Sequence, residues 1–424
     1  MDLARIRISS DGSGFEADGK PFFYFADTAW SAFTNLGMDE WIEYLDHRAS
    51  QGFNHLQINI LPQWDRSASG PAAEPFEAGA DGSRDFSRPN PAYFDRAERM
   101  VAAAAERGLR PALVLLWCDF VPGTWAAERA LSRTMPFGAV APYVEYAARR
   151  FAPYAPVYLA SGDTDYPESA VDHYAEALRA VKRADPDGLT CLHSQPGADV
   201  PDRLSAMDEL DFYMYQSGHT MEEQFRTWDW AKRFSAKARR RPAVNGEPCY
   251  DGHKYGMKQG RFSGIDIRRA FFQSVLCGAK AGFAYGAHGV WGFHRAGDPF
   301  PSTEFSGTPY PWRTALRFEG AWDASYCVRL FEDFGLRSLL PVADDASGVE
   351  PWFLAVDPDR SRFALYLPSA APAEIPLDAS AYECRLHQLG PRRIGVPRFV
   401  PTAGGSRLSM PDAEGDVLVL GRKR

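Results

Sequence analysis

The chain lacks the marks of a disulfide framework and of a membrane anchor. Its six cysteines are scattered singly among 424 residues and form no Cys-x-x-Cys pair, which predicts reduced thiols in a core or site. No apolar run approaches the roughly 18 residues of a membrane span, and no signal stretch follows Met1. We expect a cytoplasmic protein without a membrane partner, or a secreted one if a leader has been trimmed.

An excess of basic residues is also missing. Lys and Arg total 47 against 55 Asp and Glu, which gives a net charge of −8. The averaged field therefore repels phosphates, and this disfavours a nucleic-acid or anionic-membrane partner. The chain has no Walker loop and no Gly-x-Ser-x-Gly elbow, so nucleotide-phosphate enzymes and serine hydrolases lack their usual motifs.

What the chain does contain is an alternation of apolar runs and amphipathic segments. Residues 38–49 place Met38, Trp41 and Leu45 on one face of a helix, and similar stripes follow later runs. Eight such alternations within about 330 residues predict a (β/α)₈ TIM barrel. The eight expected strands are Phe22–Ala26, His55–Leu61, Arg110–Leu116, Val157–Ala160, Leu189–His193, Phe212–Tyr215, Ala243–Gly246 and Gly282–Gly286.

The competing fold is an open doubly wound sheet, but no Gly-x-Gly-x-x-Gly turn follows the first expected strand. After about residue 335 the helical stripes stop, and short alternating runs with Pro and Gly between them predict a small antiparallel β-sandwich. We therefore predict two domains. Residues 1–335 form the barrel, with a hairpin at the N-terminus, and residues 336–424 form the sandwich.

Polar and aromatic residues gather where the expected barrel strands end, which is where barrel enzymes place their active sites. Sugars require this mixture, because their C–H faces stack on aromatic rings and their hydroxyls need hydrogen-bond partners. We therefore expect a carbohydrate partner and no cofactor. The expected sugar-binding residues are Asp27, Trp30, Trp64, Trp117, Asp119, His193, Gln216, Asn245, Tyr285, His288 and Trp291.

Two carboxylates stand out in this set. Asp163 follows the fourth strand and Glu247 follows the seventh, so their side chains face each other across the barrel mouth. Glycoside hydrolysis needs one protonated and one ionised carboxyl group beside the same bond. We predict that Asp163 is the general acid and base and that Glu247 is the nucleophile. The structural alternatives are a helix cap for Asp163 and an arginine partner for Glu247.

Two other functions remain open at this point. A metal-dependent barrel hydrolase could use His193, His219 and His288, although no His-x-His or other clustered metal motif is present. We expect hydroxyl-binding or structural roles for these histidines and no metal site. The other alternative is a carbohydrate-binding protein without catalysis, in which the two carboxylates lie too far apart.

Several segments resemble one known family. Residues 23–30 (FYFADTAW) and 44–54 (YLDHRASQGFN) are similar to the opening of the apiosidase-like family, glycoside hydrolase family 140, also known as domain of unknown function 4038. Residues 241–250 (RPAVNGEPCY) and 278–291 resemble its seventh and eighth strand segments. Residues 385–390 and 416–420 resemble the collagen-binding-type β-domain that often follows.

The resemblance implies a retaining exo-glycosidase that removes a terminal sugar, with apiose from a pectin side chain as the characterised case. The aspartate after strand four is the acid and base in that family, and the glutamate after strand seven is the nucleophile. These roles fall on Asp163 and Glu247. The family commonly has Gly-Gly-Asp where this chain has Ser161-Gly162-Asp163.

Overall fold

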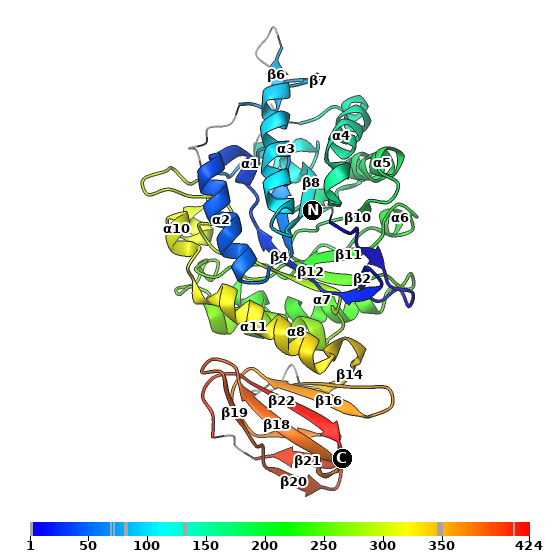
Figure 1. Ribbon diagram of the computed structural model, residues 1–424, viewed down its shortest axis with the longest axis vertical. Coiled ribbons are helices and arrows are strands. Elements are labelled where there is room, and N and C mark those ends of the chain that lie inside the picture. The colour runs from blue at the N-terminus through cyan, green and yellow to red at the C-terminus, as the bar shows by residue number, and fades with distance from the viewer. Residues whose placement is uncertain are drawn as a thin grey trace.

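The computed structural model describes residues 3–67, 70, 73–79, 84–129, 134–345, 351–409 and 412–424. Eight parallel strands form one sheet in the order β10-β9-β8-β5-β4-β13-β12-β11. A parallel bridge between His193 and Met214 joins the two ends of this order, so the sheet closes into a barrel surrounded by helices (Figure 1). The predicted TIM barrel is confirmed.

Each expected apolar run forms a barrel strand, because parallel strands covered on both faces must be apolar along their length. Most bounds differ from the expected ones by one or two residues. The strands are β4 (Tyr24–Thr28), β5 (His55–Asn59), β8 (Arg110–Trp117), β9 (Val157–Gly162), β10 (Leu189–Cys191), β11 (Tyr213–Gln216), β12 (Ala243–Glu247) and β13 (Gly282–Tyr285).

A helix follows every barrel strand. Seven of them have ten or more residues, whereas α6 after β10 is a single turn. None of the helices in the described part of the chain is long and apolar enough to cross a membrane. The helices of the outer ring are α2 (Met38–Ser50), α3 (Pro91–Ala105), α4 (Phe137–Phe151), α5 (Glu168–Ala184), α6 (Asp202–Ser205), α7 (Arg226–Ser235), α8 (Gly264–Leu276) and α11 (Glu319–Phe334).

Additions to the barrel were only partly expected. The predicted N-terminal hairpin is a three-stranded antiparallel sheet, because β3 (Lys20–Phe22) joins β1 (Arg7–Ile8) and β2 (Phe15–Ala17). Between β5 and α3, the chain forms an antiparallel arm of β6 (Phe76–Ala78) and β7 (Arg84–Pro89). The arm projects from the barrel at the top of Figure 1. Its strands carry little apolar sequence, so the pattern gave no signal for it.

The C-terminal part consists of two antiparallel sheets, as the predicted sandwich requires. One has the order β14-β15-β16-β22-β18-β19 and the other β17-β21-β20. Their strands are β14 (Leu340–Asp344), β15 (Phe353–Val356), β16 (Arg362–Leu367), β17 (Ala373–Ile375), β18 (Tyr382–Gln388), β19 (Arg393–Gly395), β20 (Phe399–Thr402), β21 (Gly405–Leu408) and β22 (Val417–Lys423). Figure 1 shows this part beside α8 and α11.

A buried ion-pair network fastens the two parts together. Arg268 of α8 donates to Asp416, which directly precedes β22, with nitrogen–oxygen distances of 2.7 and 3.1 Å. It also donates to Asp323 of α11 at 2.7 Å. The Tyr366 hydroxyl donates to Asp416 at 3.2 Å. Because Asp416 is fully buried, its charge depends on these partners.

Candidate active site

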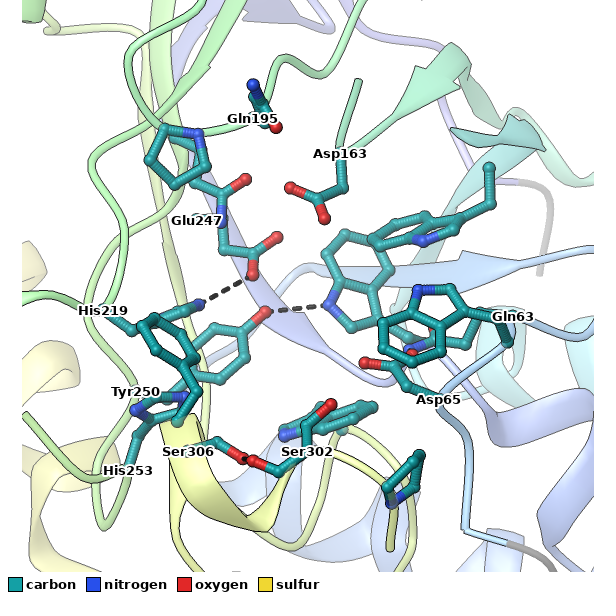
Figure 2. Close-up of a pocket in the computed structure, with 18 of the residues that line it drawn as sticks. Gln63, Asp65, Asp163, Gln195, His219, Glu247, Tyr250, His253, Ser302 and Ser306 are labelled. Carbon is teal, nitrogen blue, oxygen red and sulfur yellow. Dashed lines mark hydrogen bonds and ion pairs between the residues drawn. The ribbon is translucent and has the colours of Figure 1, made fainter. Parts of the chain in front are cut away.

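A pocket of about 600 Å³ opens at the carboxyl ends of the barrel strands. This volume is within the range of about 300–1,000 Å³ that encloses small ligands. Asp163 and Glu247 both line it, and Figure 2 shows their carboxyl groups directed toward each other. The structure therefore brings together two side chains that are 84 positions apart in sequence.

Glu247 reaches the pocket through an irregularity in its strand. Tyr215 of β11 pairs with Asn245, but the next residue, Gln216, pairs with Glu247, so Gly246 is skipped. Regular alternation would place Asn245 and Glu247 on one face of the sheet. The bulge at Gly246 turns the Glu247 side chain inward, in line with the frequent occurrence of bulges beside active sites.

Two histidine nitrogens lie close to the Glu247 carboxylate, and the one from His219 is hydrogen-bonded to it. His219 Nε2 lies 3.0 Å from Oε1, and His193 Nε2 lies 3.2 Å from Oε2. The Tyr250 hydroxyl accepts from Trp30 Nε1 at 2.8 Å and is itself within hydrogen-bond reach of Glu247. Burial raises the pKa of Glu247, but the two histidine contacts outweigh it and leave the pKa below its ordinary value. The geometry thus favours an ionised Glu247.

Asp163 sits on an unusual backbone directly after β9. Its φ of 49° lies in the left-handed region, which Asp tolerates better than most residues. Its carbonyl accepts from Trp125 Nε1 at 2.8 Å, and its N–H donates to His193 Nδ1 at 3.1 Å. The residue before it must be small, because the Trp117 ring packs directly against Gly162. A Cβ on Gly162 would lie 2.2 Å from Trp117 Cε3.

The surroundings of Asp163 raise its pKa, whereas those of Glu247 lower its pKa. Burial raises the pKa of Asp163 well above its ordinary value, and the nearby charge of Glu247 raises it further. Asp65 and Asp165 add smaller contributions in the same direction. The two pKa values are thus moved apart in the directions that general acid catalysis beside a nucleophile requires.

Aromatic side chains form much of the pocket wall. Trp30 and Trp117 lie with ring centroids 5.2 Å apart, and Trp64 meets Trp125 edge to face at 5.8 Å. Trp291 and Phe300 also line the pocket, with ring centroids 5.6 Å apart. Of the sugar-binding residues expected from the sequence, the structure places five on the pocket surface, namely Trp30, Trp64, Trp117, Gln216 and Trp291.

Three other expected residues point away from the pocket. Asp27 is fully buried and accepts from Arg48 Nε and the Tyr44 hydroxyl of α2, each at 2.6 Å. Asn245 donates to Ser217 and to Ser274 of α8. The Tyr285 hydroxyl donates to Asp251 at 3.3 Å. These side chains support the barrel wall, because their polar groups are taken up by partners outside the pocket.

The remaining three lie behind the pocket surface. His193 is fully buried and touches Glu247 rather than open space. His288 Nε2 lies 2.9 Å from the Gly307 carbonyl, and its Nδ1 accepts from Trp291. Asp119 is fully buried. His193, His219 and His288 do not form a common ligand set, and the described residues contain no group of three or more His, Cys, Asp or Glu arranged to hold a metal ion.

Some pocket residues were not among the predicted binders. Gln63, Asp65 and Gln195 end the second and fifth strand regions, so their positions already indicated a site. Tyr250 lies only three residues after Glu247. Others come from long loops whose course the sequence pattern does not give, namely Trp125, Arg129, Pro196, Thr220, His253, Phe300, Pro301, Ser302, Glu304, Phe305 and Ser306.

The barrel, the aromatic pocket and the facing carboxyl groups with opposite pKa shifts together define the class of glycoside hydrolases. The catalytic-domain model described as apiosidase-like matches residues 9–337. The chain therefore belongs to the apiosidase-like family, and the family resemblance seen in its sequence is confirmed. No curated protein sequence matches the chain.

Solved structures share the fold at low sequence identity, two of them over nearly the whole chain. A structure titled "Glycoside hydrolase" has 17% identity and a TM-score of 0.80, with 99% of this chain and 97% of that chain covered. A family 5 glycoside hydrolase from Bacteroides vulgatus has 18% identity and a TM-score of 0.81, with 99% and 93% covered. A family 5 mannosidase from Rhizomucor miehei has 13% identity and a TM-score of 0.53, with 79% and 100% covered.

Proposed function

We propose that this protein is a retaining exo-glycosidase that removes a terminal sugar from a plant-type glycan or glycoside, as its apiosidase-like sequence suggests. The observation that carries the proposal is the pairing of Asp163 with Glu247 in one pocket, with their pKa values shifted in opposite directions. Two such carboxyl groups are the machinery of glycoside hydrolysis.

In the proposed reaction, Asp163 donates its proton to the glycosidic oxygen while Glu247 attacks the anomeric carbon. The bond to the leaving group breaks, and a glycosyl ester on Glu247 forms. Asp163, now ionised, then removes a proton from water. The resulting attack on the anomeric carbon releases the sugar and returns Glu247 to its carboxylate form.

The pocket shape supports cleavage at a chain end. Trp64 and Trp125 line it, as does the loop that carries Ser302 and Ser306. Trp30 and Trp117 offer apolar faces next to the carboxyl groups, suited to the C–H face of one sugar ring. A pocket bounded in this way suits a terminal residue better than the middle of a polysaccharide.

The first experiment identifies the sugar and the roles of the two carboxyl groups. Aryl glycosides of apiose, arabinose, galactose, glucose and rhamnose are screened for release of the phenol, and proton NMR follows the anomer that forms first. We expect retention of configuration. Glu247→Ala and Asp163→Ala should each lower kcat by several orders of magnitude while circular dichroism shows an unchanged fold.

Azide separates the two roles. Glu247→Ala with azide should give a glycosyl azide of inverted configuration, and Asp163→Ala should give one of retained configuration. Near wild-type turnover by Glu247→Ala would overturn the nucleophile assignment. Activity that a chelator abolishes and zinc restores would instead favour a metal-dependent hydrolase. Binding of the sugars without any turnover would favour a carbohydrate-binding protein.

A further inference from the structure

His193 is held between the backbone of Asp163 and the carboxylate of Glu247. Its ring stacks on Trp117 with centroids 6.1 Å apart and an interplanar angle of 27°, and its edge contacts Trp30 at 5.7 Å. Its backbone N–H donates to Ser161 Oγ at 3.0 Å, and its carbonyl accepts from the same hydroxyl at 3.2 Å. Because the side chain is fully buried, it cannot contact a sugar directly.

The hydrogen bond at His193 Nδ1 fixes where the ring proton resides. The backbone N–H of Asp163 can only donate, and it lies 3.1 Å from Nδ1, so Nδ1 must be the unprotonated acceptor. The single ring proton is then on Nε2. This nitrogen lies 3.2 Å from Glu247 Oε2, within ion-pair distance but not aligned for a hydrogen bond. The Asp163 contact therefore selects the neutral tautomer, which places the ring proton on the nitrogen nearest Glu247.

We propose that His193 is a positioning residue that couples the acid to the nucleophile: its Nδ1 holds the backbone of Asp163 and its Nε2–H orients the Glu247 carboxylate. This inference rests on the proposed glycosidase function. The left-handed backbone at Asp163 is disfavoured for most L-residues, and the bond to Nδ1 helps to hold it. The same ring limits rotation of the Glu247 carboxylate, so one side chain sets the relative placement of both groups.

The neutral tautomer is also compatible with pKa changes of opposite direction at the two carboxyl groups. A doubly protonated imidazole would stabilise both carboxylates, because it would place a full positive charge next to Asp163 as well as Glu247. A neutral ring offers Glu247 an N–H dipole without that charge. Asp163 therefore remains suited to carry a proton while Glu247 stays ionised.

Two substitutions separate the two contacts of the ring. In His193→Asn, Oδ1 can replace Nδ1 as the acceptor for the Asp163 N–H, but nothing reaches Glu247. In His193→Gln, the side-chain amide can replace Nε2–H as the donor to Glu247, but the acceptor for Asp163 is lost. Each variant is compared with wild type on the phenyl and 2,4-dinitrophenyl glycosides of the sugar that the screen identifies, with thermal unfolding as the folding control.

The two variants should change different measured quantities, the pH profile in His193→Asn and the rate in His193→Gln. His193→Asn should shift the acidic limb of the kcat/KM profile upward by about one pH unit, because Glu247 has lost a donor. His193→Gln should leave that limb in place and lower the rate about 100-fold on the phenyl glycoside. Its rate on the dinitrophenyl glycoside should fall much less, because that leaving group needs little protonation. The proposal is overturned if each variant loses the same factor in rate on both glycosides and the acidic limb of the kcat/KM profile moves in neither variant.

A measurement on the wild-type protein tests the tautomer without any turnover. In ¹⁵N-histidine-labelled protein, the His193 signals are assigned by their loss in His193→Asn. They should show a protonated Nε2 and an unprotonated Nδ1 at pH 7. Protonation at Nδ1, alone or together with Nε2, would overturn the proposal. If no glycoside is cleaved, the proposed function fails, and the tautomer is still decided by this spectrum.

Discussion

Asn245 and Glu247 lie two residues apart in β12, yet their side chains reach opposite sides of the barrel wall. Asn245 donates to Ser274 of the outer helix α8, whereas Glu247 faces the pocket. The bulge at Gly246 separates them. The position of the proposed nucleophile thus depends on the backbone bulge at this glycine.

Substitution of that glycine should therefore damage the site. A Cβ on Gly246 would lie 2.3 Å from Met214 Cγ, so Gly246→Ala must displace the buried Met214 side chain or the bulge itself. We expect a loss of about 1–3 kcal/mol in the free energy of unfolding and a lower kcat. Gly138→Ala is the control, because a Cβ there meets nothing within 4 Å in helix α4, and helical alanine is favoured. Wild-type stability and turnover in Gly246→Ala would contradict the role given to the bulge.

The pH dependence of activity should be bell-shaped. The acidic limb reports protonation of Glu247 and should lie below the ordinary range of a glutamate, because its histidine partners lower the pKa. The alkaline limb reports loss of the proton from Asp163 and should lie above the ordinary range of an aspartate, since burial and the charge of Glu247 raise the pKa. Initial rates of kcat/KM across pH measure both limbs. An alkaline limb inside the ordinary aspartate range would contradict the acid assignment.

The opposite pKa changes of the two carboxyl groups predict opposite effects of two isosteric substitutions on stability. The raised pKa of Asp163 means that its contribution to stability is lost as pH rises through the folded-state pKa. Asp163→Asn should therefore unfold at a higher temperature than wild type at pH 8, with little difference at pH 4. A tenfold change in acidity between the folded and unfolded states corresponds to about 1.4 kcal/mol of stability.

Glu247 provides the contrast to Asp163. Its pKa is lowered in the folded protein, so its contribution is present at neutral pH and is lost only as pH falls through the folded-state pKa. Glu247→Gln should lower the unfolding temperature at pH 7. Calorimetry of both variants at the two extremes of pH checks the signs, and a stabilised Glu247→Gln protein would show that its histidine contacts are weak.

The contact between the two domains should be essential to stability. Asp416→Ala leaves the buried Arg268 with Asp323 as its remaining carboxylate partner. Breaking a buried pair from one side costs about 3–5 kcal/mol, and urea unfolding measures the loss. Arg385→Ala is the control, since Arg385 is exposed, and its effect should stay within about 0.5 kcal/mol. If Asp416→Ala unfolds like wild type, the network does not fasten the domains.

The sequence was most informative where one physical rule dominated. All eight barrel strands were predicted because strands buried on both faces are apolar, and the pocket positions of Asp163 and Glu247 were predicted because barrel sites form at strand ends. The side-chain directions were less predictable. The bulge that separates Asn245 from Glu247 breaks the alternation on which such predictions depend.

Partners from distant segments account for other differences. Asp27 also ends a strand, but Arg48 and Tyr44 of the following helix take up its carboxylate, and this pairing has no local signature. The same holds for His193, whose position behind the pocket depends on contacts with Trp30 and Trp117 from two other strand regions. The polar arm of β6 and β7 offers no apolar pattern from which a strand could be predicted.

The tryptophan-rich pocket has a practical consequence for binding studies. Five of the eleven tryptophans in the chain line the pocket, and the Trp30 indole is hydrogen-bonded to Tyr250 beside the proposed nucleophile. Occupancy by a sugar changes the solvent around these fluorophores, so intrinsic emission of the unlabelled protein provides an optical titration. Candidate ligands can be ranked in this way before any chromogenic compound has been synthesised.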